Sequence, residues 1–503
     1  MLESLLAGLE MALRLDTMLM MALGLVLGMF IGALPGFTTI MAMAVLLPIS
    51  FFLSPLVGIP FLIGVYKGGI FGGSIPAILV SMPGTGASVA TLFDGPALTK
   101  KGKSRKALEM ALFSSAFGDI TSDIITILLI GPIALIAMRI GPPELAAVMV
   151  LSLLVIVVSG GGVVVKGLLM LLVGLFLAMI GQDPIGAASR FTFDFFAIRS
   201  GIPLLPMLIG LFALPEIFIA IEKRTTDFVR KTSGKAEGER LTFAEFKGCF
   251  RTICRSTGIG TVIGMIPGVG QVVAAFMGYA AAKSASPTPE KFGTGELEGV
   301  AAAEAANNAV NGPTLVPLMT IGVPGDNITA ILLGAFVAQG LRPGPELFAT
   351  QSALVYAILF AMLLANLLFV VVGYALVPVF AKIVTIGKSY LLPLTIVFAF
   401  AGTYVYRSNT LDLVFLVVFG IAGYALRKLK FDVTPLVMGF ILGPVLEYSF
   451  GQTVTLGQGN ILGYVIGDRP ITVVIVIITP FLTYFMWRRG AKLRRTYADE
   501  GGH

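Results

Sequence analysis

Two segments of this chain combine helix-breaking residues with oxygen-bearing side chains. The first reads Ser81-Met-Pro83-Gly84-Thr85-Gly-Ala-Ser88, and the second reads Gly-Val-Pro324-Gly325-Asp326-Asn327. Glycine lets backbone groups approach a ligand, and proline leaves the carbonyl one turn earlier unpaired. Helix N-termini beyond such breaks suit carboxylates, while freed carbonyls with hydroxyl and amide oxygens suit Na⁺. The pattern predicts a site for an anion and an accompanying cation.

The second break follows an unusual group of polar residues in an apolar run. Glu304 is followed by Asn307, Asn308 and Asn311, so that Asn307 and Asn311 share one helical face. A carboxylate and three amides are costly at membrane depth unless they meet partners, water or ions. Alternatively, these four side chains could have a purely structural role and form hydrogen bonds between helices, which are common in membrane bundles.

Charged residues in apolar surroundings are the candidates for ion coupling, by cation coordination or proton relay. These candidates are Asp94, Asp119, Asp123, Glu304 and Lys67. Asp94 lies close to Lys100, so a capped aspartate at the membrane interface is an alternative of at least equal weight. Lys67 could attract an anionic substrate, neutralise a nearby carboxylate or extend to the surface.

Other kinds of chemistry are nearly excluded by what the chain lacks. His503 is the only histidine, and the only cysteines are Cys249 and Cys254, which we expect to be free thiols. A Ser-His-Asp site or a histidine-rich metal centre is therefore not expected. The chain has no P-loop motif, and the glycines at 293–299 follow no predicted strand. We expect no cofactor, no nucleotide and no metal beyond a Na⁺ site.

Composition places the chain in a membrane. Hydrophobic residues make up 56%, charged residues 13%, and mean hydropathy is +0.93. Apolar runs of spanning length recur from about residue 17 to residue 487. The N-terminus lacks a basic region and a small-residue cleavage site, so we expect the first span to be retained. The net charge of +7 is then a signal of topology rather than of nucleic-acid binding.

The sequence contains an internal repeat that divides it into two similar halves. Gly28-Met-Phe-Ile-Gly-Ala-Leu-Pro-Gly36 matches Gly260-Thr-Val-Ile-Gly-Met-Ile-Pro-Gly268, and Pro76 with Pro83-Gly84 recurs at the same spacing as Pro317 with Pro324-Gly325. The predicted organisation is a first transmembrane repeat at 1–221, a linker at 222–255, a second repeat at 256–469, and an extra span with a basic tail at 470–503.

Charge placement predicts that the repeats are inverted. The linker carries nine Lys and Arg residues and the tail carries five, so the positive-inside rule puts both in the cytoplasm. The second repeat plus one unpaired span must then return to the inside, which requires an odd number of crossings per repeat. The basic run at 100–106 would also lie inside. Repeats of opposite orientation are common in secondary transporters.

The predicted fold class is an all-α integral membrane protein with two inverted-topology repeats, broken helices and one extra C-terminal span. We expect roughly 11–12 transmembrane segments. Segments 58–98 and 300–340 are interpreted as re-entrant hairpins, because irregular backbone at membrane depth survives only inside protein or beside a wet cavity.

On these motifs the chain resembles the large membrane subunit of the tripartite tricarboxylate transporter family. The resemblance rests on Gly-Ala-Leu-Pro-Gly36, Pro83-Gly-Thr, Asp94-Gly, Phe292-Gly-x-Gly295, Glu304-Ala-Ala-Asn-Asn308 and Pro343-Gly-Pro345, and it covers nearly the whole chain. Lys67 departs from the family pattern, in which this position is aromatic. The resemblance implies a transporter of the bacterial inner membrane that imports carboxylates with Na⁺ or H⁺. It also implies two partners, a small four-helix membrane subunit and a periplasmic solute-binding protein.

The function hypothesis is an ion-coupled carboxylate importer whose site lies between the two Pro-Gly breaks. Two alternatives stay open, a passive anion channel and an intramembrane enzyme. The expected substrate contacts are Gly36, Ser81, Pro83, Gly84, Thr85, Ser88, Gly268, Asn307, Asn308, Asn311, Pro324, Gly325, Asp326 and Asn327.

Overall fold

The computed structural model describes residues 2–34, 37–159, 163–186, 188–195, 198–222, 238–383 and 388–500. Within these ranges the chain is almost entirely helical, with one antiparallel ribbon of β1 (Gly181–Gln182) and β2 (Ser189–Arg190). The chain divides into two compact units. Unit 1 comprises residues 1–134, 216–266 and 270–408, and unit 2 comprises residues 135–215, 267–269 and 409–503.

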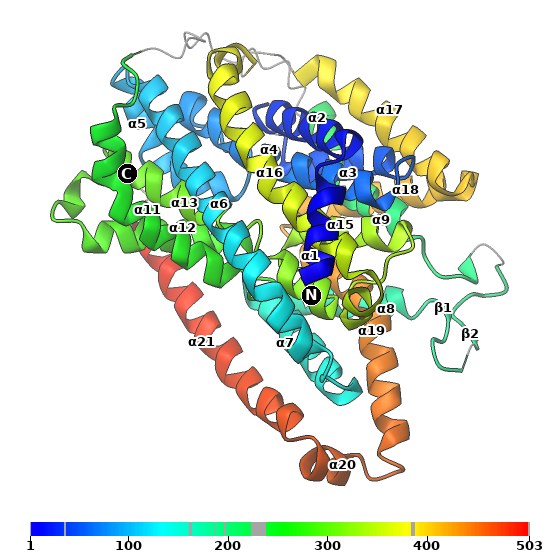
Figure 1. Ribbon diagram of the computed structural model, residues 1–503. Helices are drawn as coiled ribbons and strands as arrows, with labels where there is room; N and C mark the ends of the chain where they lie inside the picture. The colour runs from blue at the N-terminus through cyan, green and yellow to red at the C-terminus, as the bar shows by residue number, and fades with distance from the viewer. Residues whose placement is uncertain are drawn as a thin grey trace. The chain divides into compact units, whose positions relative to one another are not determined.

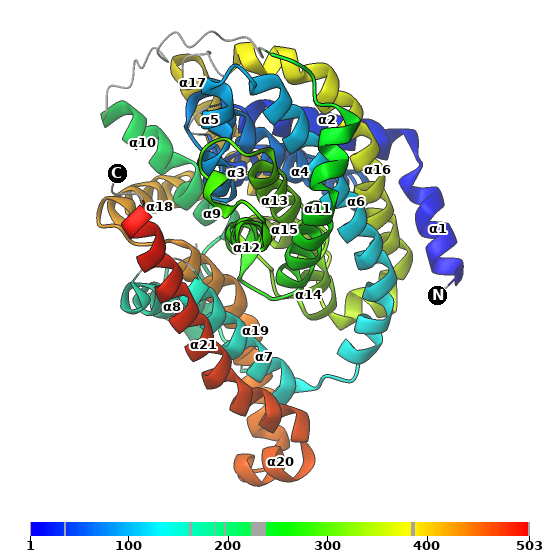
Figure 2. The ribbon, with the colours of Figure 1, turned by 90° about the vertical axis from the view of Figure 1, so that its left-hand side faces the viewer.

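Unit 1 contains both predicted hairpins. Its helices are α1 (Leu2–Ala12), α2 (Leu15–Gly32), α3 (Thr39–Ser50), α4 (Pro55–Val80), η1 (Ala87–Phe93), α5 (Gly95–Lys100), α6 (Ser104–Ala137), α10 (Leu214–Glu222), α11 (Phe243–Gly264), α12 (Gly270–Ala285), η3 (Pro289–Lys291), α13 (Leu297–Asn308), α14 (Leu315–Ile321), α15 (Asn327–Ala338), α16 (Pro345–Ile383) and α17 (Lys388–Arg407). In both views α4 and α2 lie together beside α16, so early and late segments of the chain share one bundle (Figures 1 and 2).

Unit 2 contains the ribbon and the remaining helices. These are α7 (Pro142–Ser159), α8 (Val164–Ala178), α9 (Leu204–Phe212), α18 (Thr410–Lys428), α19 (Thr434–Leu456), α20 (Ile461–Asp468) and α21 (Pro470–Glu500). Helix α19 packs on α7 and α8, and α21 runs along α7 (Figure 2). Each unit therefore draws on both halves of the sequence, because long-range packing crosses the boundary between the predicted repeats.

Several helices are long and apolar enough to cross a membrane. Six qualify in the described residues, or seven if the bent pair α20 and α21 forms one span, and four shorter apolar helices accompany them. Large apolar side chains on these helices face outward, such as Leu128, Val371 and Phe481, which would be costly in water. The chain is therefore an all-α, multi-pass membrane protein. The expected total of 11–12 segments and the inversion of the repeats stay predictions.

Glycines lock α4 against α2. A Cβ atom on Gly28 of α2 would lie 2.3 Å from the Val65 carbonyl oxygen, and one on Gly68 of α4 would lie 2.1 Å from that of Leu25. Only glycine permits backbones to approach this closely, as in the small-residue interfaces of membrane helices. The contact fixes the central turns of α4, which carry Tyr66 and Lys67.

The second half of unit 1 repeats this contact with α11 and α13. A Cβ atom on Gly260 would lie 2.2 Å from the Ala306 carbonyl oxygen. This matches the 2.3 Å between a Cβ on Gly28 and the Val65 carbonyl oxygen. The matching pairs make α11 the counterpart of α2 and α13 the counterpart of α4. The residues that follow the contacted carbonyls, Tyr66-Lys67 and Asn307-Asn308, are thus equivalent positions in the two halves.

The second half of the predicted linker contacts the start of α6. Lys106 pairs with Glu245 at 2.7 Å, and the backbone N–H of Leu241 donates to Glu109 at 2.7 Å. Burial alone would raise the pKa of Glu245, but hydrogen bonds from Lys106 and Thr242 lower it to about 2. This part of the predicted linker therefore packs against the segment that follows the run 100–106, while the cytoplasmic placement of both stays a prediction. Cys249 and Cys254 on α11 are free thiols, also as predicted.

Candidate functional site

The most highly charged buried group in the candidate site surrounds Lys67. Its Nζ atom lies 2.9 Å from Asp119 Oδ1, 2.8 Å from Asp123 Oδ2 and 3.0 Å from Asn366 Oδ1. These four residues, hereafter the lysine cluster, come from α4, α6 and α16, and their side chains are fully buried. Three of the predicted ion-coupling residues are thus brought together, and Lys67 neutralises carboxylates rather than reaching the surface.

A chain of hydrogen bonds connects the lysine cluster to the second Pro-Gly break. Asn311 Nδ2 donates to Asp119 Oδ1 at 2.9 Å, and Gln271 Nε2 donates to Asn311 Oδ1 at 3.3 Å and also to the Tyr66 hydroxyl. Tyr66 in turn donates to Asp326 Oδ2 at 2.9 Å. All these groups are buried. Asp119 and Asp326 are therefore connected by contiguous hydrogen bonds, through which a change of charge at one can alter the hydrogen bonding of the other.

Glu304 forms a second buried group with residues of η1 and α6. Thr91 Oγ1 donates to Glu304 Oε1, and Ser115 Oγ donates to Glu304 Oε2 at 3.3 Å. Asn308 Nδ2 donates to Ser115 Oγ at 2.7 Å. Glu304 and Asn308 thus act as one polar group, as their spacing predicted, but they contact other helices as well as each other.

Asn307 differs from its neighbours because its side chain is buried without a partner. Neither its Nδ2 nor its Oδ1 atom makes a hydrogen bond, although only 1% of the residue is exposed. One turn earlier, Ala303 packs against Ala90 and Ala275, so this face of α13 looks towards η1 and α12. A buried amide without a partner is rare in folded proteins, so Asn307 stays a candidate for ligand contact.

The two breaks have the same backbone geometry. Ser81 and Gly322 end α4 and α14 in the left-handed conformation, with φ of 58° and 74°. The next N–H groups, of Met82 and Val323, donate to the carbonyls of Pro76 and Pro317 at 3.2 and 3.1 Å. These are matching C-terminal caps. The helix breaks predicted from Pro83 and Pro324 are thus present and equivalent.

A reciprocal capping pair follows each break. Ser88 N donates to Thr85 Oγ1 at 3.2 Å while Thr85 N donates to Ser88 Oγ at 3.1 Å. In the second hairpin Thr329 N donates to Asp326 Oδ1 at 2.7 Å while Asp326 N donates to Thr329 Oγ1 at 2.9 Å. Each pair satisfies donors at the start of the next helix.

Both breaks approach the beginning of α12. A Cβ atom on Gly86 would lie 3.1 Å from the Val272 side chain, and one on Gly270 would lie 3.2 Å from Asp326 Cβ. Figure 2 shows α12 beside α13 and α11. The first turn of a helix has free N–H groups and the positive end of its dipole, so this place can accept a carboxylate.

Asp94 has a different environment from the other candidates. Its Oδ1 atom accepts hydrogen bonds from the backbone N–H groups of Gly293, Gly295 and Glu296 at 2.8–2.9 Å, and its Oδ2 atom accepts one from Tyr279 at 2.9 Å. These four donors saturate the carboxylate. Asp94 is thus a capped aspartate, as the alternative had it, but its partners are Tyr279 and the backbone of the loop before α13 rather than Lys100.

The remaining predicted contacts are scattered. Ser81 and Pro83 are exposed, Pro324 and Gly325 are buried beside Asp326, and Asn327 is partly buried. Gly84 packs against Gly73, whose Cα atom a Cβ on Gly84 would approach to 2.6 Å. Gly268 belongs to unit 2, where it contacts Ile156. Gly36 lies outside the described residues.

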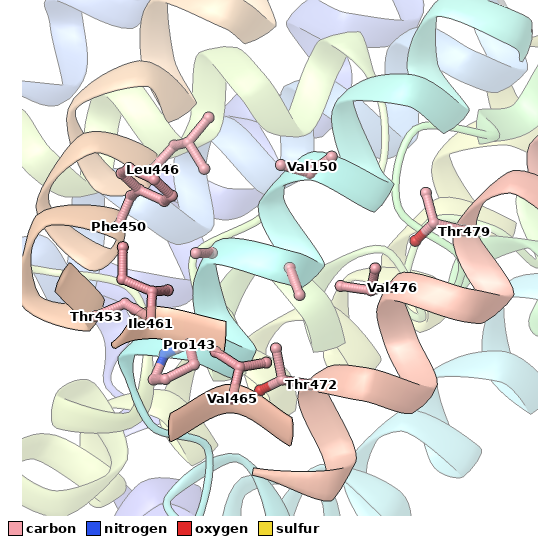
Figure 3. Close-up of a pocket in the computed structure, with 12 residues that line it drawn as sticks. Pro143, Val150, Leu446, Phe450, Thr453, Ile461, Val465, Thr472, Val476 and Thr479 are labelled. Carbon is pink, nitrogen blue, oxygen red and sulfur yellow. The ribbon is translucent and has the colours of Figure 1, made fainter. Parts of the chain in front are cut away.

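Unit 2 has an apolar cavity of about 270 Å³. It lies among α7, α19, α20 and α21, and Val150, Leu446, Phe450 and Val476 face it (Figure 3). The hydroxyls of its threonines, Thr453, Thr472 and Thr479, bond to neighbouring groups of the protein. The cavity therefore offers a carboxylate no free donor, and no predicted site residue lines it.

Some residues of the site were not predicted from the sequence. Tyr66, Gln271 and Asn366 connect its parts, yet none was singled out. Asn366 is a single amide in the apolar run of α16, a pattern that signals a buried role. Gln271 directly follows the glycines at the start of α12. Their partners, however, lie far away in sequence and could not be inferred.

Interrupted helices, buried charges and lipid-facing surfaces define a multi-pass membrane transport protein. Residues 18–438 match the model of the tripartite tricarboxylate transporter TctA family, and the chain belongs to this family. A protein of Agrobacterium vitis, described as an uncharacterized 52.8 kDa protein in the TAR-I ttuC' 3' region, is 35% identical over 91% of both chains. A second from that organism, described as an uncharacterized protein in the TAR-II ttuC' 3' region, is 37% identical over 40% of this chain and 83% of its own. No solved structure matches the chain.

Proposed function

We propose that this chain is the membrane-embedded carrier of a tripartite system that imports small organic anions with two or three carboxylates. Family membership supports a tricarboxylate transporter subunit with partner subunits. The finer proposal places it in the bacterial inner membrane, with the linker and C-terminus cytoplasmic. Its partners are a small four-helix membrane subunit and a periplasmic solute-binding protein, and Na⁺ or H⁺ drives uptake.

The observation that carries this proposal is the approach of both Pro-Gly breaks to the start of α12. Gly86 of the first hairpin and Asp326 of the second reach neighbouring residues, Val272 and Gly270. Free N–H groups of α12 would bind one carboxylate, and the unpartnered amide of Asn307 would bind a second group. Freed backbone and small residues would allow the ligand to approach closely.

Two features speak against the alternative functions. A transporter family argues against an intramembrane enzyme. A passive channel would need a continuous polar path, whereas the charged groups of Lys67, Asp119, Asp123 and Glu304 have no exposed surface. A carrier that opens by moving its parts explains such buried polar groups more simply.

Counterflow exchange tests the proposal. The complex, with both proposed partners, is reconstituted in vesicles loaded with citrate or succinate, and entry of the labelled acid is followed. We expect saturable exchange that falls sharply in Asn307→Ala and stays at the wild-type level in the exposed control Asp16→Asn. Wild-type exchange in Asn307→Ala would refute the site, and flux without saturation would favour a channel.

A further inference from the structure

The hydrogen bonds of the lysine cluster leave two carboxylate oxygens bare. Asp119 Oδ1 accepts from Lys67 and Asn311, and Asp123 Oδ2 accepts from Lys67 and Asn366. The other two oxygens, Asp119 Oδ2 and Asp123 Oδ1, are buried and have no partner. Each aspartate thus has one saturated oxygen and one that could carry a hydrogen atom.

The charges of the cluster do not balance when both aspartates are ionised. Lys67 supplies one positive charge against two negative ones, and all three side chains have no exposed surface. The other titratable groups facing the cluster are Tyr66 on α4 and Asp326 before α15, connected through Gln271, with Glu304 on α13 beyond Ser115. None of these adds a positive charge. An uncompensated buried charge is expensive, so the cluster favours gaining one cation or one proton.

Lys67 occupies the space between the two bonded oxygens of the aspartates. Its ammonium group already takes three oxygen ligands at 2.8–3.0 Å, one from each aspartate and one from Asn366. A Na⁺ ion between the aspartates would have to displace this tethered cation. A proton needs no such space, because it binds to a bare oxygen of an existing carboxylate.

Thr126 marks the oxygen that would take the proton. Its hydroxyl is buried and has no partner. A Cβ atom built on Gly312 would lie 2.3 Å from Asp123 Oδ1 and 3.2 Å from Thr126 Oγ1. The unpartnered oxygens of Asp123 and Thr126 therefore both lie next to Gly312. The two oxygens are not hydrogen-bonded to each other in this structure, so a proton on Asp123 Oδ1 would supply a donor in a region where the Thr126 hydroxyl is unused.

We infer that the lysine cluster is a proton-carrying site, with Asp123 as the carrier and Lys67 as a built-in cation, so that uptake is driven by H⁺ rather than Na⁺. This inference rests on the proposed transport function and specifies its coupling ion. On the side where the proton is taken up, the O–H bond forms at Asp123 Oδ1. On the other side that bond breaks, the proton leaves to water and the carboxylate stays paired with Lys67.

The test uses infrared difference spectra and uptake by the same reconstituted complex. Spectra recorded across a pH titration report the C=O stretch of a protonated carboxylic acid and need no substrate. We expect such a band in the wild type, its loss in Asp123→Asn, and its retention in the exposed control Asp16→Asn. In Asp119→Asn, where Lys67 balances Asp123 alone, the band should appear only at lower pH. Citrate accumulation should follow an imposed pH gradient in the wild type and in Asp16→Asn, and should lose that dependence in Asp123→Asn.

The possible outcomes separate the two proposals. Absence of citrate and succinate exchange in the wild type would overturn the proposed function, while the infrared band would still decide the proton site. A band unchanged in Asp123→Asn, or a band at the wild-type pH in Asp119→Asn, would overturn the assignment. Accumulation that follows a Na⁺ gradient and ignores the pH gradient would overturn the choice of ion.

Discussion

The two hairpins of unit 1 share one close helix contact and one kind of helix cap, but they carry different side chains at equivalent positions. Gly28 contacts α4 as Gly260 contacts α13, and both breaks end in matching caps. The positions equivalent to Tyr66 and Lys67, however, are Asn307 and Asn308, and the residue equivalent to the neutral Thr85 is the acidic Asp326. Duplication thus supplies the scaffold, while the differences place a cation in the first hairpin and an anion in the second.

Replacing Lys67 with asparagine would make the first hairpin like the second and should have the largest effect. Asp119 and Asp123 would lose their counterion, which costs about 3–5 kcal/mol for a buried pair. Unfolding of the purified protein in detergent should show this loss, and Asp123→Asn added to the same variant should recover part of it. Unchanged stability would mean that Lys67 does not balance the aspartates.

Exchanging Asp326 for threonine would make the second break like the first. Threonine can still cap α15, but the Tyr66 hydroxyl would lose its acceptor, which costs about 1–3 kcal/mol. Citrate exchange should fall about tenfold to a hundredfold, while the amount of folded protein in the membrane stays similar. Full exchange by this variant would show that the charge of Asp326 is dispensable.

Alanine at Gly68 tests the close contact between α2 and α4, which positions the first hairpin. Its Cβ atom would lie 2.1 Å from the Leu25 carbonyl oxygen, so the helices must separate, at a cost of about 1–3 kcal/mol. Gly258 of α11 is the matched control, since a Cβ there meets nothing within 4 Å. The midpoint temperature of thermal unfolding should be lowered by Gly68→Ala and unchanged or raised by Gly258→Ala. Equal effects would argue against the tight interface.

Substitutions in the two capping pairs should have the smallest effect on stability. Ser88→Ala and Thr329→Ala each remove one half of a reciprocal pair, and each should cost about 1 kcal/mol. The loss should be somewhat larger for Thr329, because its hydroxyl also donates to the Asp326 carboxylate at 2.7 Å. Hydrogen exchange of the first amides of η1 and α15 would measure it. A larger increase in exchange at η1 in Ser88→Ala than at α15 in Thr329→Ala would contradict the expected order.

The helix breaks could be predicted from the sequence because proline and glycine act locally. Pro83 and Pro324 lie where α4 and α14 end, and the equal spacing of the motifs predicted their equivalence. The roles of Asp94 and Lys67 could not be chosen in advance, since a carboxylate saturated by backbone donors and one that faces a lysine look alike in sequence. Asn366 lies far along the chain from Lys67, and only packing of α16 on α4 brings them together.

A cryo-electron microscopy map of the complex with bound citrate would test the central claim most directly. The account predicts ligand density at the first turn of α12, between residues 83–88 and residues 324–327 and within reach of Asn307. Density in the apolar cavity of unit 2, or in any place away from both breaks, would contradict it.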